Sequence, residues 1–459
     1  MTSFRIEHDF VGEKAVPQAA YYGIHSLRAQ ENFPITGQRL CPEMIIALAN
    51  VKKACALANQ EAGVLSDSIA EAIIKACDEV ACGCFHEQFI VDPIQGGAGT
   101  STNMNANEVI ANRAIELLGG ALGDYALVNP NDHVNCGQST NDVYPTCGKL
   151  ALYRLSQGLL TQLERLIDAL SAKAAAFDHV VKMGRTQLQD AVPIRLGQEF
   201  AAYVSVLRRE AARLDKARQE LLCVNLGGTA IGTSVNADPV YIRTVVPKLA
   251  QITGLPFIQS DDLIDATQNL DCYVTFSSAL KSCGVSLSKI CNDLRLMSSG
   301  PQDGLGEITL PPRQNGSSIM PGKVNPVIPE VVNQIAFRLI GFDTTITLAA
   351  EAGQFELNAF EPVIFDTLLS GVQQLTQGLA TLTDHCILGI TANPSHCQEE
   401  VERSVGIVTA LCPLIGYSAA CSLAKEALRT RTPIRELVVA HGLLTPQQAE
   451  QALEPRNMT

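Results

Sequence analysis

One eleven-residue stretch holds the residues best suited to chemistry. GSSIMPGKVNP, residues 316–326, combines small residues and two prolines with a single lysine, Lys323, and no acidic residue follows before Glu330. A lysine ammonium is a point charge that suits an anion. A serine beside a glycine, such as Ser317, can act as a general base where backbone N–H groups stabilise its alkoxide. The stretch therefore predicts either a loop that handles a small anion or a flexible linker.

Two other interpretations of this stretch fail on spacing. The phosphate-binding P-loop needs four residues between its glycines, followed by Gly-Lys-Ser/Thr. Here five residues separate Gly316 from Gly322, and Val324 replaces the hydroxyl residue. Ser317 and Ser318 lack the Gly-x-Ser-x-Gly pattern of a nucleophilic serine, and eight scattered histidines offer no evident partner. Nucleotide binding and acyl transfer are therefore disfavoured.

Three more stretches share this richness in Ser, Thr, Asn, Gln and Gly. They are GGAGTSTNMNANE from Gly96, NPNDHVNCGQSTND from Asn129 and GRTQLQDAVP from Gly184. We expect helices to follow them, with Thr100 and Ser101 before a helix from Asn105, and residues 139–141 before a helix from about Val143. Free N–H groups at helix N-termini attract carboxylates, although the same residue types are ordinary caps. Four such loops together favour a small anionic substrate.

Two further segments predict structure more readily than chemistry. VNLGGTAIGTSVNAD, from Val224, is glycine-rich and reads as a packed turn, with function as the alternative. Residues 404–424 are uncharged, which raises the question of a membrane span. Gly406, Pro413 and Gly416 divide that run into short pieces, so a small buried domain is expected instead.

Composition narrows the class of protein. A chain of 459 residues with 46% hydrophobic and 18% charged residues predicts a soluble globular protein of two or three units. The net charge of −13 disfavours nucleic acid and anionic lipid as partners. The start, MTSFRIEHDFVGEK, has no secretory h-region, so a cytoplasmic location is expected. Fifteen cysteines then read as reduced, buried small hydrophobes, and Cys82-Gly-Cys84-Phe-His86 lacks the second pair of a zinc site.

Long helices are the main structural signal. Apolar residues step by three and four along four segments, which predicts amphipathic helices over Leu152–Leu170, Val204–Leu214, Phe276–Met297 and Phe365–Cys386. Their near-heptad period favours a bundle. Helices of about thirty residues reach roughly 45 Å, so we expect them to pack against partner subunits. Short extended pieces are expected near Arg5–Ile6 and Phe89–Val91, and the fold class is mainly α.

GSSIMPGKVNP resembles the signature loop of the aspartase/fumarase superfamily, and the other three polar blocks resemble its remaining motifs. The likeness runs from RIEHDFVGEK and AAYYGIHSLRAQENFPITG almost to the C-terminus. Within the superfamily, VNPVIPEVVNQ and EAGQFELNAFEP resemble the members that deaminate aspartate rather than the fumarases. Fumarate hydratase and a catalytically silent structural protein are the alternatives.

The resemblance implies an architecture. It implies a mainly α, three-domain subunit with a central bundle of five long helices, and a homotetramer with a twenty-helix core. The implied domains are residues 1–138, mixed and mostly helical, residues 139–392, the long-helix bundle with loop 316–326, and residues 393–459, small and helical. Each active site would lie where three subunits meet, which agrees with the overlong helices.

The resemblance also implies a reaction, the reversible deamination of L-aspartate to fumarate and ammonia through an aci-carboxylate. It implies no organic cofactor and leaves open a divalent cation such as Mg²⁺ as an activator. Ser317 matches the general base, and Gly316 and Gly322 match loop hinges. The other matches are substrate-binding positions: Thr100, Ser101, Ser139, Thr140, Asn141, Thr186, Gln187, Ser318, Lys323 and Asn325.

One position departs from part of the family, and four others have two interpretations each. Gln187 stands where fumarases and some members that act on aspartate carry histidine, and an amide cannot take up a proton at neutral pH. This disfavours a fumarase and any histidine-assisted step. His133 could belong to a secondary anion site or be a plain loop residue. Asp142, Asp190 and Glu330 could orient site residues or merely cap helix starts.

Overall fold

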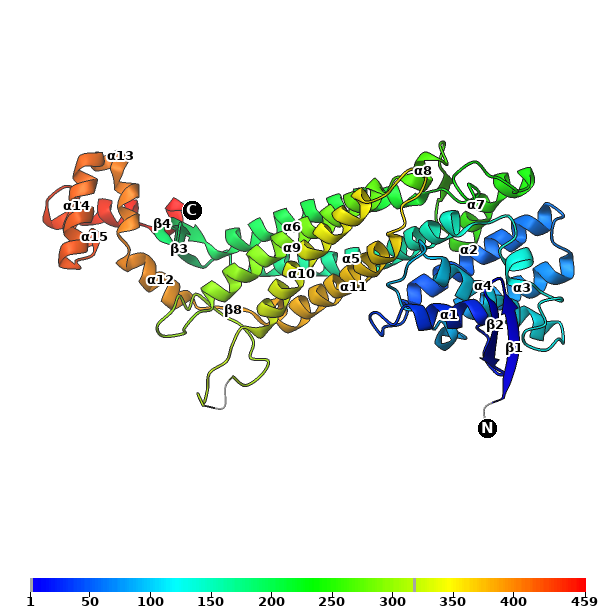
Figure 1. Ribbon diagram of the computed structural model, residues 1–459. Coiled ribbons are helices and arrows are strands. Elements are labelled where there is room, and N and C mark those ends of the chain that lie inside the picture. Colours follow the sequence, from blue (N-terminus) through cyan, green and yellow to red (C-terminus); the bar gives the residue numbers. More distant parts are fainter. Residues whose placement is uncertain (1–2, 317–318) are drawn as a thin grey trace. The chain divides into compact units, whose positions relative to one another are not determined.

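The protein is described here by a computed structural model, which covers residues 3–316 and 319–459 (Figure 1). Its internal contacts divide the chain into two compact units. Unit 1 comprises Met1–Leu160, Ala212–Ser282 and Arg338–Gln374. Unit 2 comprises Thr161–Ala211, Cys283–Phe337 and Leu375–Thr459. The division cuts across the long helices, each of which contributes one part to each unit. The three-domain boundaries expected from the resemblance stay a prediction.

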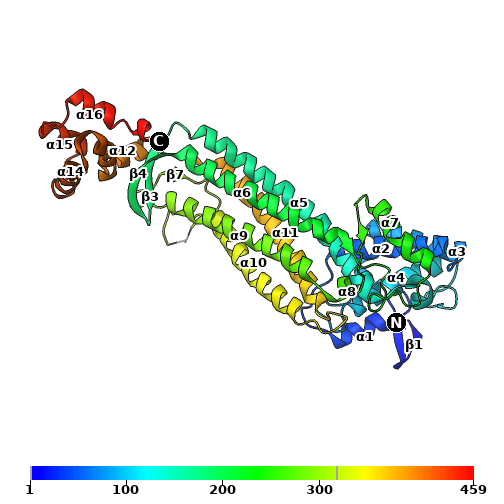
Figure 2. The ribbon, with the colours of Figure 1, turned by 90° about the horizontal axis from the view of Figure 1, so that it is seen from above.

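Within the described residues, five helices have 24 or more residues. They are α5 (Thr140–Ala176), α6 (Leu196–Gln219), α9 (Asp271–Met297), α10 (Val327–Glu351) and α11 (Glu361–His385). Both ribbon views show the segments of these helices that belong to one unit lying side by side (Figures 1 and 2). The four predicted apolar stripes fall in α5, α6, α9 and α11, and the mainly α class is confirmed.

The helix without a predicted stripe, α10, is apolar on more than one face. Its buried side includes Val332 and Leu339, at 2% and 3% exposure. Phe337 and Leu348, however, are each 63% exposed. Apolar residues all around a helix produce no single stripe, because periodicity depends on a polar face for contrast.

Unit 1 surrounds its part of the bundle with shorter elements. Its helices are α1 (Ile24–Asn32), α2 (Pro42–Glu61), α3 (Asp67–Ala81), α4 (Thr100–Leu117), α7 (Pro239–Thr253) and α8 (Asp265–Gln268). Its strands are β1 (Phe4–Asp9), β2 (Gly12–Pro17), β5 (Cys223–Val224) and β6 (Ile258–Gln259). β1 pairs with β2 in an antiparallel hairpin, and β5 pairs with β6 in parallel. Short helical turns are η1 (His86–Gln88), η2 (Pro130–Val134) and η3 (Glu220–Leu222).

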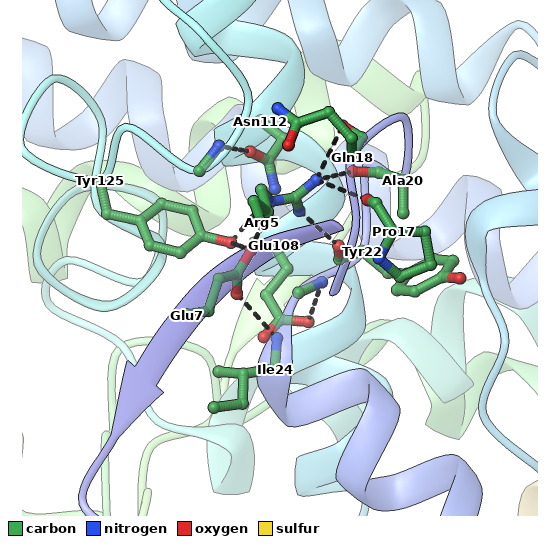
Figure 3. Close-up of polar contacts among 12 residues, drawn as sticks. Arg5, Glu7, Pro17, Gln18, Ala20, Tyr22, Ile24, Glu108, Asn112 and Tyr125 are labelled. Atoms are coloured by element: carbon green, nitrogen blue, oxygen red, sulfur yellow. Dashed lines mark hydrogen bonds and ion pairs between the residues drawn. The ribbon is translucent and has the colours of Figure 1, made fainter. Parts of the chain in front are cut away.

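A buried charged cluster fixes the N-terminal hairpin to α1 (Figure 3). The Arg5 guanidinium donates to Glu7 Oε1 at 2.8 Å and to four backbone carbonyl oxygens, those of Pro17, Gln18, Ala20 and Tyr22. Glu7 Oε2 accepts the Ile24 N–H and Glu108 Oε2 accepts the Gly23 N–H, both at 2.8 Å. Two carboxylates therefore occupy the N-terminus of α1, where the helix dipole favours negative charge. This cluster gives Arg5, Glu7 and residues 20–24 of the two N-terminal blocks a structural role.

The extended piece expected at Phe89–Val91 does not belong to a sheet, whereas the one at Arg5–Ile6 is strand β1. A single side chain replaces the missing strand partner. The Ile90 N–H donates to Asn105 Oδ1 at 2.9 Å, and Asn105 Nδ2 donates to the Gln88 carbonyl at 3.0 Å. An asparagine can satisfy both backbone groups in this way, as a neighbouring strand would.

Unit 2 contains its own small elements beside the bundle. Its helices are α12 (Pro394–Arg403), α13 (Cys412–Ile415), α14 (Tyr417–Thr430), α15 (Ile434–Ala440) and α16 (Pro446–Ala452). Its strands are β3 (Val181–Thr186), β4 (Gln189–Arg195), β7 (Ile308–Thr309) and β8 (Thr391–Ala392), in two antiparallel pairs. Its short helical turns are η4 (Ile387–Gly389), η5 (Val405–Leu411) and η6 (Pro455–Met458).

The uncharged run 404–424 is broken as expected. It passes from η5 through α13 into α14, and Gly416, at φ 83°, separates the two helices. Among the described residues, none of the helices is apolar over a length sufficient to cross a bilayer.

The cysteines are partly as predicted. All fifteen lie among the described residues and all are free thiols. Seven are buried, but Cys82 and Cys84 are exposed, so the expectation of uniform burial is wrong. Both flank the left-handed Gly83 in the turn that ends α3, where side chains leave the packed face of the helix.

Candidate active site

The start of α5 carries the densest group of predicted site residues. The helix begins at Thr140, three residues earlier than expected, so Ser139 is its N-cap. The Asn141 N–H donates to Ser139 Oγ at 3.2 Å, and the Ser139 N–H donates to Asp142 Oδ1 at 2.9 Å. This reciprocal arrangement resembles a capping box, with Asp142 at N3 and the Asn141 N–H, at N2, as the donor to the cap side chain. Since Ser139 Oγ serves as an acceptor here, its own proton stays available for a ligand.

Thr140 is held from the side by α4. Asn103 Nδ2 donates to Thr140 Oγ1 at 3.1 Å, which again leaves the hydroxyl proton free to donate elsewhere. Thr140 is 8% exposed and Asn103 is 1% exposed, so this contact lies inside unit 1. The structure therefore brings the α4 and α5 starts together within one unit.

Thr100 and Ser101 lie in the first turn of α4, which begins at Thr100 rather than at Asn105. Gly99 precedes them at φ 90°, and a Cβ added there would lie 2.3 Å from the Tyr144 ring. Glycine is therefore required at this point by conformation and by the close approach of the ring. The N–H groups of this turn form the N-terminus of α4, where the dipole is positive.

A buried lysine that the sequence reasoning missed supports this region. Lys52, on α2, is fully buried, and its Nζ donates to Asn135 Oδ1 and Gln138 Oε1, both at 2.8 Å. Asn135 Oδ1 also accepts from Asn103 Nδ2 at 3.2 Å. Burial lowers the pKa of Lys52 to about 8. Lys52 forms no ion pair within the described part of the chain, and one of its acceptors, Gln138, directly precedes Ser139. The sequence signal that could have revealed it is the position of Lys52 in the otherwise largely apolar helical segment VKKACALAN.

Asn141 is oriented by the glycine-rich stretch 224–238. Asn141 Nδ2 donates to the Ala230 carbonyl at 2.7 Å, and Asn225 Nδ2 donates to the Asn141 carbonyl at 2.9 Å. Asp142 Oδ2 accepts the N–H groups of Gly227 and Thr229, each at 3.0 Å. The packed turn predicted from Val224 is thus packed against the predicted site block.

In unit 2, the block GRTQLQDAVP is not a loop before a helix but a hairpin, β3 and β4. Thr186 pairs with Gln189, and Gln187 and Leu188 form the two-residue turn at φ 54° and 61°. Two left-handed residues define a type I′ turn, which normally contains Asn or Gly. The hairpin was missed because these turn residues are absent. Thr186 and Gln187 are exposed at its tip.

A buried ion network supports this hairpin. Glu307 is fully buried; its Oε2 lies 2.8 Å from Lys182 Nζ, and its Oε1 lies 2.5 Å from an Arg185 nitrogen. Arg185 also contacts Glu400 at 3.1 Å, and Lys182 contacts Glu199 at 2.8 Å. These carboxylates raise the pKa of Lys182 against the opposing effect of burial. The base of the hairpin is thereby tied to the segment that enters β7.

The signature stretch begins and ends with a backbone contact in unit 2. The Gly316 N–H donates to the Lys323 carbonyl at 3.0 Å, and a Cβ on Gly316 would lie 2.4 Å from that oxygen. Gly322 has φ 85°. Lys323 is exposed and Asn325 is half-buried just before α10. Ser317 and Ser318, the predicted base and its neighbour, lie outside the described residues, and the hinge role of both glycines stays a prediction.

The comparisons with known proteins cover nearly the whole chain. Residues 12–341 match the family described as Lyase, and residues 407–459 match the family described as Fumarase C C-terminus. Aspartate ammonia-lyase of Bacillus subtilis (strain 168) is 54% identical over 456 residues, which cover 99% of this chain and 96% of that protein. Aspartate ammonia-lyase of Escherichia coli (strain K12) is 49% identical over 459 residues, covering 99% and 96%.

The chain belongs to the aspartase/fumarase superfamily. Solved structures support the same assignment. A fumarate lyase:delta crystallin from Brucella melitensis, bound to cobalt, has a TM-score of 0.97 and 49% identity over 99% of both chains. A class II fumarase from Schistosoma mansoni has a TM-score of 0.96 and 34% identity over the same shares. Fumarases therefore share the fold at lower identity.

The positions whose role was uncertain have clear surroundings in this superfamily member. His133 Nδ1 accepts the Asn129 N–H at 2.9 Å, so Nε2 carries the proton of the neutral ring. Asp190 Oδ2 accepts from Ser404 Oγ at 2.8 Å and caps no helix. Glu330 lies in the first turn of α10, where a carboxylate suits the helix dipole. Asp142 both caps α5 and holds the glycine-rich stretch.

Among the described residues, no group of three or more His, Cys, Asp and Glu side chains is arranged to hold a metal ion. The Cys82, Cys84 and His86 set does not form such a group. The expected absence of an organic cofactor and the effect of a divalent cation both stay predictions.

Proposed function

We propose that the protein is a carbon–nitrogen lyase that catalyses the reversible deamination of L-aspartate to fumarate and ammonia. The observation that carries this proposal is the identity of 49 to 54% to aspartate ammonia-lyases over nearly the full chain, against 34% to a class II fumarase. Gln187 in place of histidine supports the same choice. An ammonium leaving group needs no protonation, so the site requires no strong general acid.

The difficult step is the removal of the Cβ proton beside the β-carboxylate. It creates a dianionic aci-carboxylate, so catalysis depends on donors whose bonds strengthen as this charge appears. Ser317 is proposed as the base. Thr100, Ser101, Ser139, Thr140 and Ser318 are proposed to hold the β-carboxylate. The hydroxyl geometry of Ser139 and Thr140 supports this, because both oxygens already accept a bond and keep their protons for the substrate.

The remaining proposed contacts grip the other end of the substrate. Lys323 and Asn325 are assigned to the α-carboxylate, where an ammonium supplies a point charge. Asn141, Thr186 and Gln187 are assigned to the amino group and α-carboxylate. The exposure of Thr186, Gln187 and Lys323 is compatible with these roles, since exposed side chains are accessible to a ligand. No cofactor takes part in this proposal, and a divalent cation would act as an activator.

We further propose that the protein is a homotetramer whose active sites use residues of three subunits. The exposed side of α10 supports this. Ile340 and Leu348 lie three and eleven residues after Phe337, so the three side chains share one helix face. They are 42%, 63% and 63% exposed, respectively. Large exposed apolar patches mark interaction surfaces. Sedimentation velocity at micromolar concentration tests this, and a Leu348→Lys variant that stays tetrameric would exclude that face.

All fifteen cysteines are free, which supports the proposed cytoplasmic location, because free thiols persist in a reducing compartment. The test of the reaction itself is the ultraviolet absorbance of fumarate after the purified protein is mixed with L-aspartate. L-malate is the matched alternative substrate. Fumarate from aspartate and ammonia-dependent loss of fumarate are expected; fumarate from malate alone would identify a hydratase.

A further inference from the structure

The glycine-rich stretch 224–238 has an unusual backbone and contacts the start of α5. Three of its non-glycine residues, Thr229, Ser234 and Asn236, have left-handed φ angles of 56°, 57° and 63°. Such angles are unfavourable for residues with a Cβ and persist where surrounding contacts hold them. At Thr229 the unusual angle presents the backbone N–H to Asp142. The threonine hydroxyl itself is buried without a hydrogen-bond partner among the described residues.

Asp142 is the residue on which both segments converge. Its side chain is fully buried, and its two oxygens accept three backbone N–H groups, from Ser139, Gly227 and Thr229, at 2.9 to 3.0 Å. Buried N–H groups need an acceptor, and the Asp142 carboxylate supplies one for all three. One side chain thus fixes the cap of α5 and the loop that orients Asn141.

Few titratable groups surround Asp142. The titratable groups that face it are Lys52 and Cys55 from α2, Cys147 from its own helix and Tyr241 from α7. Lys52 is the cation of this set, and it acts through space without an ion pair. Burial raises the pKa of Asp142 to about 6, although the three N–H groups and Lys52 oppose that rise.

We propose that Asp142 is a positioning residue for the deamination, which holds Ser139, Asn141 and the glycine-rich stretch in their substrate-binding geometry only while it is a carboxylate. A carboxylate can accept all three N–H bonds, whereas a protonated carboxyl turns one oxygen into a donor that faces an N–H group. Either Ser139 or the pair Gly227 and Thr229 then loses its acceptor. This inference rests on the roles proposed above for Ser139 and Asn141.

The consequence for the reaction is a loss in turnover rather than in binding alone. The donors at Ser139 and Thr140 matter most when the β-carboxylate gains charge, so their misplacement lowers kcat more than it raises KM. Displacement of site groups by about 1 Å can cost on the order of 10²-fold in rate. Since the change follows one proton, kcat falls as pH drops through about 6 and returns when the pH is restored.

The test compares Asp142→Asn with wild type on L-aspartate from pH 5 to pH 9, with thermal unfolding of both. Asparagine offers one acceptor oxygen and one donor group, and so imitates the protonated acid at every pH. We expect kcat to fall on the order of 10²-fold, with the acid limb near pH 6 present in wild type and absent in the variant. Glu361→Gln is the matched control. That residue is also a buried carboxyl, with its pKa raised to about 8, and among the described residues it makes no hydrogen bond to the site block.

Two results would overturn the proposal. One is a folded Asp142→Asn protein with near-normal kcat and an unchanged acid limb. The other needs no variant: a wild-type kcat that stays constant down to pH 5, which remains decisive if Asp142→Asn does not fold. A different result would overturn the proposed reaction: activity on L-malate in place of L-aspartate. In that case the same pH profiles would be measured with L-malate as the substrate. Ser139→Ala with unchanged kinetics would remove the site role on which Asp142 depends.

Discussion

The start of α5 in unit 1 and the tip of the β3–β4 hairpin in unit 2 have similar sequences and opposite surroundings. Both are short runs of Ser, Thr, Asn and Gln. Around Ser139 to Asp142, nearly every polar group is bonded to the protein's own backbone or amides. Thr186 and Gln187, by contrast, are exposed on a turn with two left-handed residues.

The difference separates two ways of preparing polar groups for a ligand. The α5 start is preorganised by hydrogen bonds within its unit, which lowers the cost of ordering when charge develops on a substrate. The hairpin tip instead has two strained left-handed residues and is held by the buried ion pairs at its base. The first region should be sensitive to changes in its bonding partners, and the second to changes in the exposed groups themselves and in that base.

The largest expected effect concerns Ser317 in the signature stretch. Ser317→Ala deletes the proposed base and should lower kcat by about 10² to 10⁴-fold, the usual contribution of general base catalysis. Fumarate absorbance with saturating L-aspartate measures this. The control is Ser395→Ala, an exposed serine on α12, which should change kcat by no more than about twofold. Near-normal turnover of Ser317→Ala, at an unchanged size-exclusion volume, would exclude the role.

The base of the hairpin offers the next largest effect, on stability. Glu307→Gln leaves Lys182 and Arg185 without their shared carboxylate in a buried site, and loss of one partner from such a network costs about 3 to 5 kcal/mol. Thermal and urea unfolding at neutral pH measure the loss. Asp384→Asn removes an exposed pair with Arg165 and should cost at most about 1 kcal/mol. Equal losses in the two variants would show that burial of the network adds nothing.

Lys323 tests whether exposure in the free unit signals substrate contact. Lys323→Ala removes a charge-assisted hydrogen bond worth about 1.5 to 3 kcal/mol, so KM for L-aspartate should rise roughly 10 to 150-fold. Initial rates over a range of aspartate concentrations give the value. Lys425→Ala, at an exposed position of α14, is the control. If both variants keep the wild-type KM, Lys323 is not a substrate ligand.

The contrast also explains what could be predicted from the sequence. The long helices were predictable because their stripes depend on local periodicity, and the polar blocks because their composition is unusual. The hairpin was not, because Gln187 and Leu188 carry no turn signal and are held left-handed by the rest of the structure. Lys52 and the docking of stretch 224–238 on Asp142 were missed for a related reason, since both depend on contacts between residues more than 80 positions apart.

The helix starts show the same limit on a smaller scale. Thr100 and Thr140 were expected just before their helices, yet both lie in the first turn. Propensity favours Ser, Thr and Asn outside a helix, where they cap it. In α4 the cap position is occupied by Gly99, which the Tyr144 ring requires, so a tertiary contact moves the boundary. The resemblance to the superfamily motif selects these residues as candidates, and the packing determines which of their groups are exposed.

The smallest effect comes from Leu188 at the hairpin tip. Leu188 is 71% exposed at φ 61°, so glycine should relieve the turn without loss of core contacts. Glycine removes the cost of the left-handed conformation but also gives the unfolded chain more conformational freedom. The net effect should be to stabilise unit 2 by about 0.5 to 1 kcal/mol. Urea unfolding measures the gain, and Gln189→Gly, in strand β4, should instead destabilise by about 0.5 to 1 kcal/mol. If Leu188→Gly stabilises the protein and lowers its activity, the strained conformation of the tip is needed for function. If it instead destabilises the assembled protein, Leu188 contacts another subunit.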